Sequence, residues 1–248
     1  MANYTFTFSP TGGTRKVADI LAEGLGGNFT DVNLCYADPK NPLSADDLCL
    51  ISIPSFGGRV PFPAVDRLKA MQGNGAKAVL VCVYGNRAYE DTLSELQDIL
   101  NAAGFVCIAA VAAIAEHSVV RSFAAGRPDA ADRAELLDFA AKIKENLSNV
   151  LGDLPGSHGT YKDFPGVPFK PAANDDCDGC GVCAGHCPTG AIDPEKPRET
   201  DASKCFTCMC CVTLCPKQAR SLGEPVMQNM NAMLSQTASG RRENELFL

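Results

Sequence analysis

Eight of the thirteen cysteines in this chain of 248 residues repeat one spacing, Cys-x2-Cys-x2-Cys-x3-Cys, and a proline follows each copy. Each cysteine of the first copy precedes its counterpart by 28 residues, so the segment is an internal duplication. A chain that spaces its thiols in this way must form a small domain around whatever those thiols bind. The first copy consists of Cys177, Cys180, Cys183, Cys187 and Pro188, and the second of Cys205, Cys208, Cys211, Cys215 and Pro216.

This spacing is the one by which bacterial proteins hold [4Fe–4S] clusters, and in two-cluster proteins the fourth cysteine of each run binds the other cluster. A tight loop aims three thiolates at one cubane, and the proline then turns the chain away. The spacing therefore predicts two [4Fe–4S] clusters with crossed ligands. The first cluster takes Cys177, Cys180, Cys183 and Cys215, and the second takes Cys205, Cys208, Cys211 and Cys187.

Other uses of the cysteines fit this spacing less well. Zinc sites also contain Cys-x2-Cys, but they take four ligands from two pairs that are usually further apart. Disulfides are disfavoured because Met1–Gly12 lacks the basic start and apolar stretch of a signal peptide, and cytosolic thiols stay reduced. Cys210 stands at the repeat position of Val182, so it is either a small apolar filler or a redox-sensitive thiol. Four further cysteines lie in or near apolar runs and are expected in the core: Cys35, Cys49, Cys82 and Cys107.

The charge balance limits the partners that this chain can have. The formal net charge is −7, and clusters held by thiolates would make it more negative. Such a surface disfavours nucleic acid and suits salt-sensitive docking to basic patches on redox partner proteins. The longest apolar run, Phe105–Ala115, is too short to span a bilayer. We therefore expect a cytoplasmic protein without membrane insertion, whose oligomeric state the sequence leaves open.

The first 150 residues alternate strand-like and helix-like patterns. Such alternation predicts a parallel sheet with helices on both faces, a doubly wound α/β domain. The predicted strands cover residues 4–8, 28–34, 48–54, 77–84 and 105–114, and the predicted helices 14–25, 63–71, 89–103 and 129–150.

The rest of the chain divides by composition. Residues 151–171 contain four glycines and four prolines, a density that excludes regular structure and indicates a linker. The cysteine motifs place a two-cluster domain at 172–224. Apolar residues at helical spacing predict a helix from Pro225 through Ser235, which begins a C-terminal segment of residues 225–248.

Three loops follow predicted strands, and their composition suits a mononucleotide. The loop after the first strand opens directly into a helix, whose free N–H groups and positive dipole end favour a phosphate; an ordinary capped turn is the alternative. Open α/β sheets bind ligands at the carboxyl ends of their strands, where the strand order reverses. The three loops are Ser9, Pro10, Thr11, Gly12, Gly13 and Thr14; Ser55, Phe56, Gly57, Gly58 and Arg59; and Tyr84, Gly85, Asn86, Arg87, Ala88 and Tyr89.

With these motifs, residues 1–150 resemble a flavodoxin-type domain. The whole chain resembles the EFR-type ferredoxins, which join such a domain to a bacterial two-cluster ferredoxin domain. The resemblance implies a flavodoxin-like five-stranded parallel sheet of order 2-1-3-4-5, followed by a small α+β domain, and FMN as a cofactor. It implies that Ser9, Thr11, Gly12, Gly13 and Thr14 hold the FMN phosphate, that Gly57, Gly58 and Arg59 line the flavin ring, and that Tyr84, Gly85, Asn86, Arg87 and Tyr89 close the other side.

The aromatic content departs from the family pattern, because the chain contains no tryptophan. Stacking on the ring therefore falls to Phe56, Tyr84 or Tyr89, with Ser55 beside them. His117 follows the last predicted strand and is either a residue at the flavin edge or a hydrogen-bonded loop residue.

A flavin beside two clusters would pass electrons singly or in pairs, because the cofactors carry that chemistry. We therefore expect an electron carrier of anaerobic-type metabolism that relays electrons between redox partner proteins through its clusters and FMN. A flavin-dependent oxidoreductase that reduces a small molecule is an alternative. A third is an N-terminal domain that binds no flavin and only docks partners.

Overall fold

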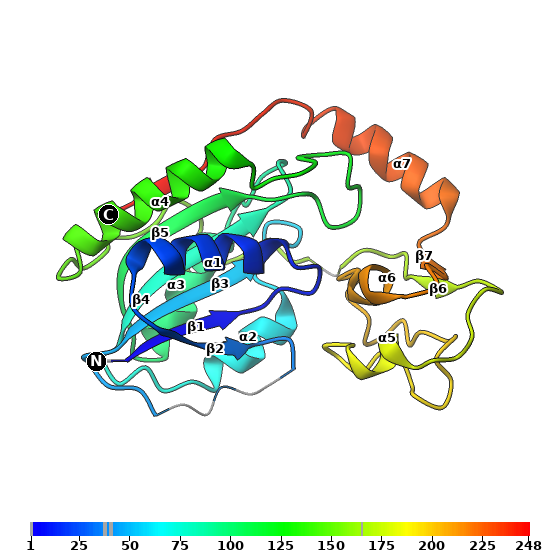
Figure 1. Ribbon diagram of the computed structural model, residues 1–248, viewed down its shortest axis with the longest axis horizontal. Coiled ribbons are helices and arrows are strands. Elements are labelled where there is room, and N and C mark those ends of the chain that lie inside the picture. The colour runs from blue at the N-terminus through cyan, green and yellow to red at the C-terminus, as the bar shows by residue number, and fades with distance from the viewer. Residues whose placement is uncertain (1, 37–38, 40–41, 165) are drawn as a thin grey trace.

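The computed structural model describes residues 2–36, 39, 42–164 and 166–248. In Figure 1 an α/β domain fills the left of the view, and a small cysteine-rich domain lies at the right. The α/β domain comes first in the sequence and the small domain follows it. Its C-terminal segment then returns to the α/β domain, so two connections join the domains (Figure 1).

The α/β domain contains one sheet of strand order β2-β1-β3-β4-β5-β8. Its first five strands are parallel and have the predicted order 2-1-3-4-5, which confirms a flavodoxin-like doubly wound fold. The sixth strand, β8, pairs antiparallel with β5 and was not predicted. The strands are β1 (Asn3–Thr7), β2 (Phe29–Asn33), β3 (Leu48–Pro54), β4 (Lys77–Tyr84), β5 (Val106–Ile114) and β8 (Glu245–Phe247).

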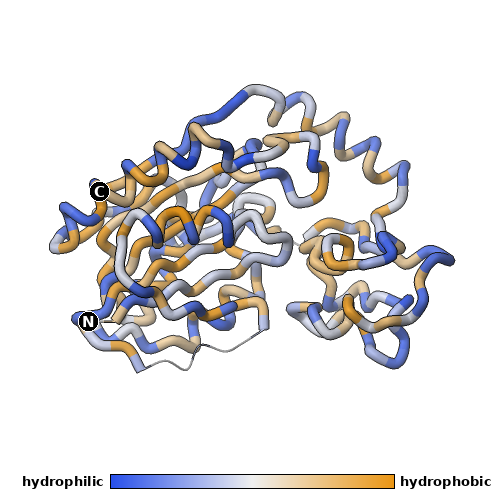
Figure 2. The backbone as a smooth tube through the Cα atoms, viewed as in Figure 1, coloured by the Kyte–Doolittle hydropathy of each residue, from blue (hydrophilic) through white to orange (hydrophobic). Residues whose placement is uncertain are grey.

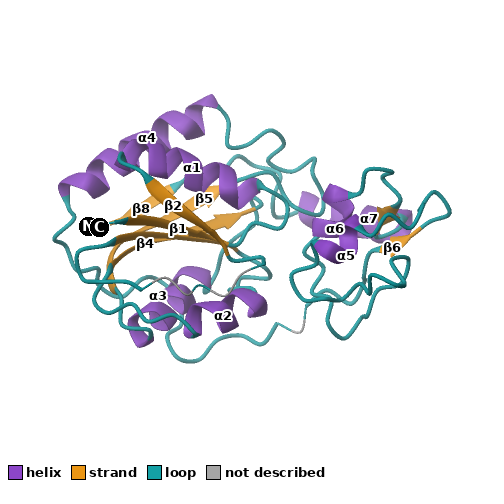
Figure 3. Cartoon of the chain, turned by 60° about the horizontal axis from the view of Figure 1, so that its bottom comes forward, coloured by secondary structure: helices purple, strands orange, loops and turns teal. Residues whose placement is uncertain are grey.

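Helices cover both faces of the sheet, as Figure 3 shows, with α1 and α4 on one face and α2 and α3 on the other. Every residue of β3 is therefore buried, as parallel strands between two helical layers require. Figure 2 shows the same division, with hydrophobic strands inside and hydrophilic residues on the outer surfaces of the helices. The helices are α1 (Gly13–Leu25), α2 (Phe62–Lys69), α3 (Thr92–Ala102) and α4 (Ala130–Glu145).

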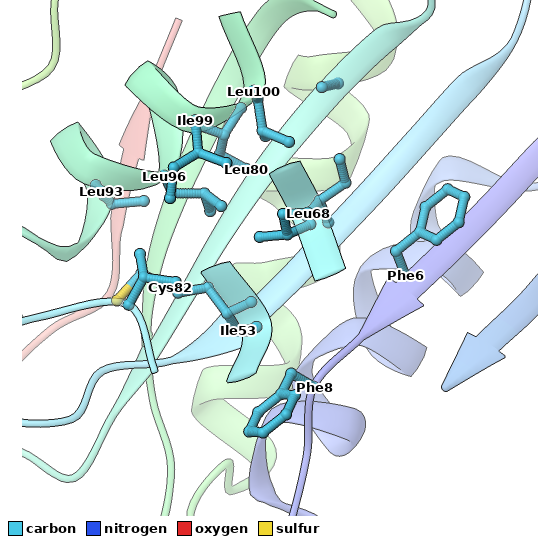
Figure 4. Packing of buried hydrophobic residues seen from close by; sticks show 14 of the residues in the cluster. Phe6, Phe8, Ile53, Leu68, Leu80, Cys82, Leu93, Leu96, Ile99 and Leu100 are labelled. Atoms are coloured by element: carbon cyan, nitrogen blue, oxygen red, sulfur yellow. The ribbon is translucent and has the colours of Figure 1, made fainter. Parts of the chain in front are cut away.

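Side chains of alternating strand residues pack against α2 and α3 to form one core (Figure 4). Phe6 and Leu80 come from the sheet, Leu68 from α2 and Leu96 from α3, and all are fully buried. The four cysteines that were expected in the core are buried. Burial raises the pKa of one of them, Cys107, to about 12, so its thiol stays protonated and packs as a small apolar group.

The small domain repeats the sequence duplication in its backbone. The helices α5 (Val182–Gly185) and α6 (Cys210–Leu214) begin 28 residues apart, after Gly181 and Met209, which both have left-handed backbone conformations. Each helix carries the third cysteine of its motif. A two-stranded sheet of β6 (Ala172–Ala173) and β7 (Arg220–Ser221) closes the domain.

The C-terminal segment leaves the small domain through α7 (Glu224–Ser235) and runs back along the α/β domain to β8 (Figure 1). Leu234 and Ala238 pack against Val120 in the loop between β5 and α4. The segment ends by adding β8 to the exposed edge of β5, with Ala110 opposite Phe247. The edge of the sheet is thereby covered by the chain's own end.

Candidate functional site

The cysteine motifs form two small cavities in the small domain. The first is lined by Cys177, Cys180, Cys183 and Cys215. The second is lined by Cys187, Cys205, Cys208 and Cys211, together with Cys210. This is the grouping expected if the fourth cysteine of each motif serves the cluster of the other motif.

Cysteine sulfurs line both cavities. Among the described residues, no three or more His, Cys, Asp and Glu side chains approach closely enough to share a single metal ion. The thiols line the walls of the two cavities rather than meeting at one point. Four motif thiols in the wall of each cavity fit the thiolate ligation of an iron–sulfur cluster.

Backbone N–H groups hold the crossing cysteines in equivalent ways. Ala191 N–H donates to Cys187 Sγ at 3.2 Å, and Ala219 N–H donates to Cys215 Sγ at 3.3 Å. These donors are again 28 residues apart, so the duplicated backbone presents a donor to the fourth sulfur of each motif. Hydrogen bonds to cysteine sulfur are among the features that set cluster potentials.

The two cavities differ in their exposure to solvent. Cys180 of the first group is exposed, whereas Cys208 and Cys211 of the second group are buried. Burial raises the pKa of Cys211 to about 11, although the neighbouring Arg220 guanidinium opposes that rise. The second cavity is therefore the better shielded from water.

The second cavity is also the one that faces the α/β domain. Arg67 on α2 donates to the carbonyl of Pro188, at 2.9 Å. The hydroxyl of Tyr36 lies 3.9 Å from Cys210 Sγ, and the Tyr36 ring meets His186 edge-on with centroids 5.6 Å apart. Cys210 is thus a buried contact residue at the junction of the two domains.

One aromatic residue of the second cysteine motif, Phe206, contacts the α/β domain directly. Phe206, which follows the ligand candidate Cys205, has its ring centroid 6.1 Å from Phe8, 5.8 Å from Phe56 and 5.4 Å from Phe62. Phe8 and Phe56 lie just beyond the carboxyl ends of β1 and β3, the edge of the sheet that faces the small domain (Figure 1). The sequence alone did not identify this contact, because a phenylalanine between two cysteines has no distinctive spacing.

The loop after β1 has the geometry of an anion site at a helix start. Gly12 takes a left-handed φ of 89°, and Ser9 Oγ accepts a hydrogen bond from Arg15 N–H at 3.0 Å. Among the described residues, the N–H groups of Gly12, Gly13 and Thr14 have no hydrogen-bond acceptor. Free N–H groups at the start of a 13-residue helix fit a phosphate.

The loop after β3 contacts other parts of the chain. Phe56 and Arg59 close a tight turn through two backbone hydrogen bonds of 3.0 and 3.2 Å. Gly57 and Gly58 both have positive φ, and a side chain on Gly57 would collide with the ring of Phe164. The linker therefore packs directly on this turn.

Arg59, predicted to line a flavin ring, is turned toward α3 and the linker. Its guanidinium forms an ion pair of 2.7 Å with Glu95 and lies over the Tyr161 ring at 5.1 Å. Ser55 of the same loop is within 2.7 Å of the Thr92 hydroxyl.

The loop after β4 is covered by the C-terminal segment. The buried Asn86 donates from its side-chain amide to the carbonyls of Ala238 and Gly240, both at 2.6 Å. Tyr84 and Tyr89 meet edge-on with centroids 5.3 Å apart. This loop is thus held in place by residues that lie about 150 positions further along the chain.

His117 is a hydrogen-bonded loop residue. Its Nδ1 accepts hydrogen bonds from Val119 N–H and Val120 N–H, at 3.2 and 3.0 Å. Burial lowers the pKa of His117 to about 4, with a contribution from Arg87, so the ring is neutral at pH 7 and accepts at Nδ1. Its side chain packs against Gly85, where a Cβ would collide with it.

The candidate flavin residues thus divide into two sets. The phosphate loop after β1 has free donors that fit a phosphate. The loops after β3 and β4 are brought to the same edge of the sheet, as predicted, but they contact the linker, α3 and the C-terminal segment.

Comparisons with known proteins identify the cysteine motif. A family model described as "4Fe-4S binding domain" matches residues 174–193, so the chain contains a 4Fe-4S binding motif of the ferredoxin type. A curated relative, the trichloroethene reductive dehalogenase of Dehalococcoides mccartyi, is 35% identical over 25% of this chain. The chain spans only 14% of the length of that relative.

Solved flavodoxins are similar to the α/β domain at low identity. Flavodoxin 1 from Bacillus cereus is 16% identical, with a TM-score of 0.43, over 58% of this chain and 98% of its own. A flavodoxin from Streptococcus pneumoniae TIGR4 is 17% identical, with a TM-score of 0.39, over 59% and 97%. The fold assignment depends on the strand order described above. Within the described residues, no helix combines the length and the apolar character needed to cross a membrane.

Proposed function

We propose that this chain is an electron-transfer protein that holds two [4Fe–4S] clusters in its small domain and FMN at the carboxyl edge of its sheet. The flavodoxin-like domain and the 4Fe-4S motif support electron transfer as the class of function. The observation that carries the finer proposal is the pair of cavities, each lined by three cysteines of one motif and the fourth cysteine of the other.

The residues of this chain have distinct roles in that proposal. Cys187 and Cys215 cross between the motifs and bind the two halves of the small domain together. Ala191 and Ala219 donate N–H groups to those two sulfurs and orient them. When bound, the clusters supply one-electron transfer and FMN supplies one- or two-electron transfer.

The positions of the two cavities support an order for electron transfer. The second cavity adjoins Phe206 and the aromatic cluster at the edge of the α/β domain. The first cavity is lined by residues of the small domain, with Cys180 exposed. We therefore assign the first cluster to exchange with a partner protein and the second to exchange with the flavin. The net charge of −7 supports partners with basic docking surfaces.

The phosphate of FMN is assigned to the loop of Ser9, Thr11, Gly12, Gly13 and Thr14. The free N–H groups there suit an anion, and the half-exposed Thr11 can add a hydroxyl donor. The ring contacts implied by the family resemblance stay a prediction.

A groove at the domain junction favours a second candidate function. It has a volume of about 770 Å³ and is lined by Phe56 and Phe62 of the α/β domain, Tyr161 of the linker, and Cys205 and Phe206 of the small domain. An organic acceptor in this groove would lie beside a ligand of the second cluster. The second candidate is therefore an oxidoreductase that reduces a small aromatic molecule with electrons from the clusters.

Anaerobic purification with iron, sulfide and flavin counted per chain tests the cofactor content. About eight iron atoms, eight sulfides and one FMN per chain are expected for two [4Fe–4S] clusters and one mononucleotide site. A preparation that contains zinc alone, or no metal, would contradict the proposal. Steady turnover of an aromatic acceptor without a partner protein would favour the oxidoreductase over the carrier.

A paired ligand experiment tests the phosphate assignment. Thr11→Val removes one hydroxyl donor and keeps the shape, and a hydrogen bond to a charged group is worth about 1.5–3 kcal/mol. We expect FMN to bind at least about tenfold more weakly, with riboflavin, which lacks the phosphate, unaffected. Thr30→Val on the exposed face of β2 is the control. Equal losses for FMN and riboflavin would show that Thr11 does not contact the phosphate.

A further inference from the structure

Arg220 is a buried cation without an acidic partner. Its side chain is only 2% exposed, and among the described residues no carboxylate lies within ion-pair distance of its guanidinium. Nη1 donates to the carbonyl of Pro197 at 2.7 Å, and Nη2 donates to the carbonyl of Pro171 at 3.2 Å and to the Thr200 hydroxyl. Nε is buried and has no acceptor among the described residues.

The guanidinium lies between the two groups of cysteines. It lines the first cavity, and its Nη1 is 3.9 Å from the sulfur of Cys183, a member of the first group. Cys183 packs in one buried cluster with Cys211, a member of the second group, so the guanidinium lies close to both groups. One positive charge thus contacts a sulfur of the first candidate cluster site and lies beside the second.

The internal duplication shows that this arginine is not required by the fold of the repeat. Ala191-Ile192 in the first copy corresponds to Ala219-Arg220 in the second, 28 residues later. Ile192 is 3% exposed and lines the second cavity as an apolar wall. An isoleucine therefore suffices at this backbone position, and the second copy has a charge where the first has an aliphatic side chain.

The buried positive charge of Arg220 is stabilised only by a nearby negative charge. A buried guanidinium is costly unless an opposite charge offsets its desolvation. Neutral carbonyls satisfy some of its donors but supply no net charge. A [4Fe–4S] core held by four thiolates is a net anion, and it becomes more negative on reduction.

We propose that Arg220 is the shared counter-charge of both clusters, and that it raises both reduction potentials by favouring the more negative, reduced state. This inference rests on the proposed function, because it requires clusters in the two cavities. Arg220 would thus adjust the reduction potentials of the clusters, a role that the spacing of the cysteines does not indicate. Net charge and hydrogen bonds to sulfur are known determinants of cluster potential.

Two substitutions separate the charge of Arg220 from its packing. Arg220→Ile installs the residue that the first copy of the repeat already accommodates, and Arg220→Lys keeps the charge without the planar fork. Both variants are purified anaerobically with the wild type and titrated with dithionite while EPR follows each cluster. We expect Arg220→Ile to shift the reduction equilibrium of both clusters at least tenfold toward the oxidised state, about 59 mV lower for a one-electron couple. Arg220→Lys should retain most of the wild-type potential.

Arg198→Gln is the matched control, because Arg198 also donates to the small domain, at the carbonyl of Cys177, but is 54% exposed. Solvent screening should leave both potentials close to wild type in this variant. Unchanged potentials in Arg220→Ile, a shift confined to one cluster, or loss of cluster loading in both Arg220 variants would each overturn the inference. Wild-type protein without iron and sulfide would instead refute the proposed function itself, so the two failures are distinguishable.

Discussion

Phe206 should control how tightly the small domain docks on the α/β domain. Its ring pairs with three phenylalanines at centroid distances of 5.4 to 6.1 Å. Each such pair contributes about 0.5–1.5 kcal/mol beyond the burial of area. Truncation in Phe206→Ala removes all three pairs, so we expect docking to weaken by about 2–4 kcal/mol. The population of separated domains then rises between about 30-fold and 1,000-fold.

Hydrogen exchange measured by mass spectrometry reports this separation in the full chain. Peptides that cover residues 55–64 and 202–209 should exchange faster in Phe206→Ala, because both sides of the contact become exposed. Peptides from β4, which lies within the sheet, should exchange as in the wild type. The control is Phe169→Ala, which removes a linker ring that is 47% exposed. Unchanged exchange in both junction peptides, or equal acceleration throughout the chain, would refute the reasoning.

Three further predictions follow from the sulfur groups and from one buried ion pair. Cys187→Ala should remove the second cluster, and Cys215→Ala the first, each leaving about four iron atoms per chain; iron analysis with EPR that shows the opposite losses would overturn the crossed assignment. Asp132→Asn breaks the buried pair with Arg127, whose Nε is 2.8 Å away, and should lower the free energy of unfolding in urea by about 3–5 kcal/mol. The exposed control Asp138→Asn should change it by less than about 1 kcal/mol. Burial opposes ionisation of Asp132, but hydrogen bonds from Arg127 hold its pKa below the usual value. The unfolded state therefore binds more protons, so this stability is present above the ordinary aspartate pKa of about 3.9 and is lost as the pH falls below it. Urea midpoints between pH 6 and pH 3 should show that loss in the wild type and less of it in Asp132→Asn.

Several elements follow directly from local sequence. The apolar runs at 48–54 and 77–84 are bounded by turn residues, and both become strands with the predicted limits. The helix predicted from Pro225 through Ser235 is present as Glu224–Ser235. A continuous apolar run and apolar residues at helical spacing are local properties, so they can be recognised from the sequence alone.

Other elements depend on residues far apart in the chain. The three residues of β8 have no strand pattern of their own, and they form a strand only because the edge of β5 offers unpaired backbone groups. Asn86 and His117 could be placed at the carboxyl edge of the sheet from sequence. Their hydrogen-bond partners could not, since Asn86 bonds to residues of the returning C-terminal segment.

The spacing of the cysteines alone predicted which eight thiols belong together and how they divide between two groups, because three cysteines spaced three residues apart on one tight loop can face the same point. Only the tertiary structure decided which group lies against the α/β domain, that Phe206 makes that contact, and that Arg220 lies between the groups. The physical reason is that a contact between distant segments depends on how whole domains pack. No local spacing encodes that packing.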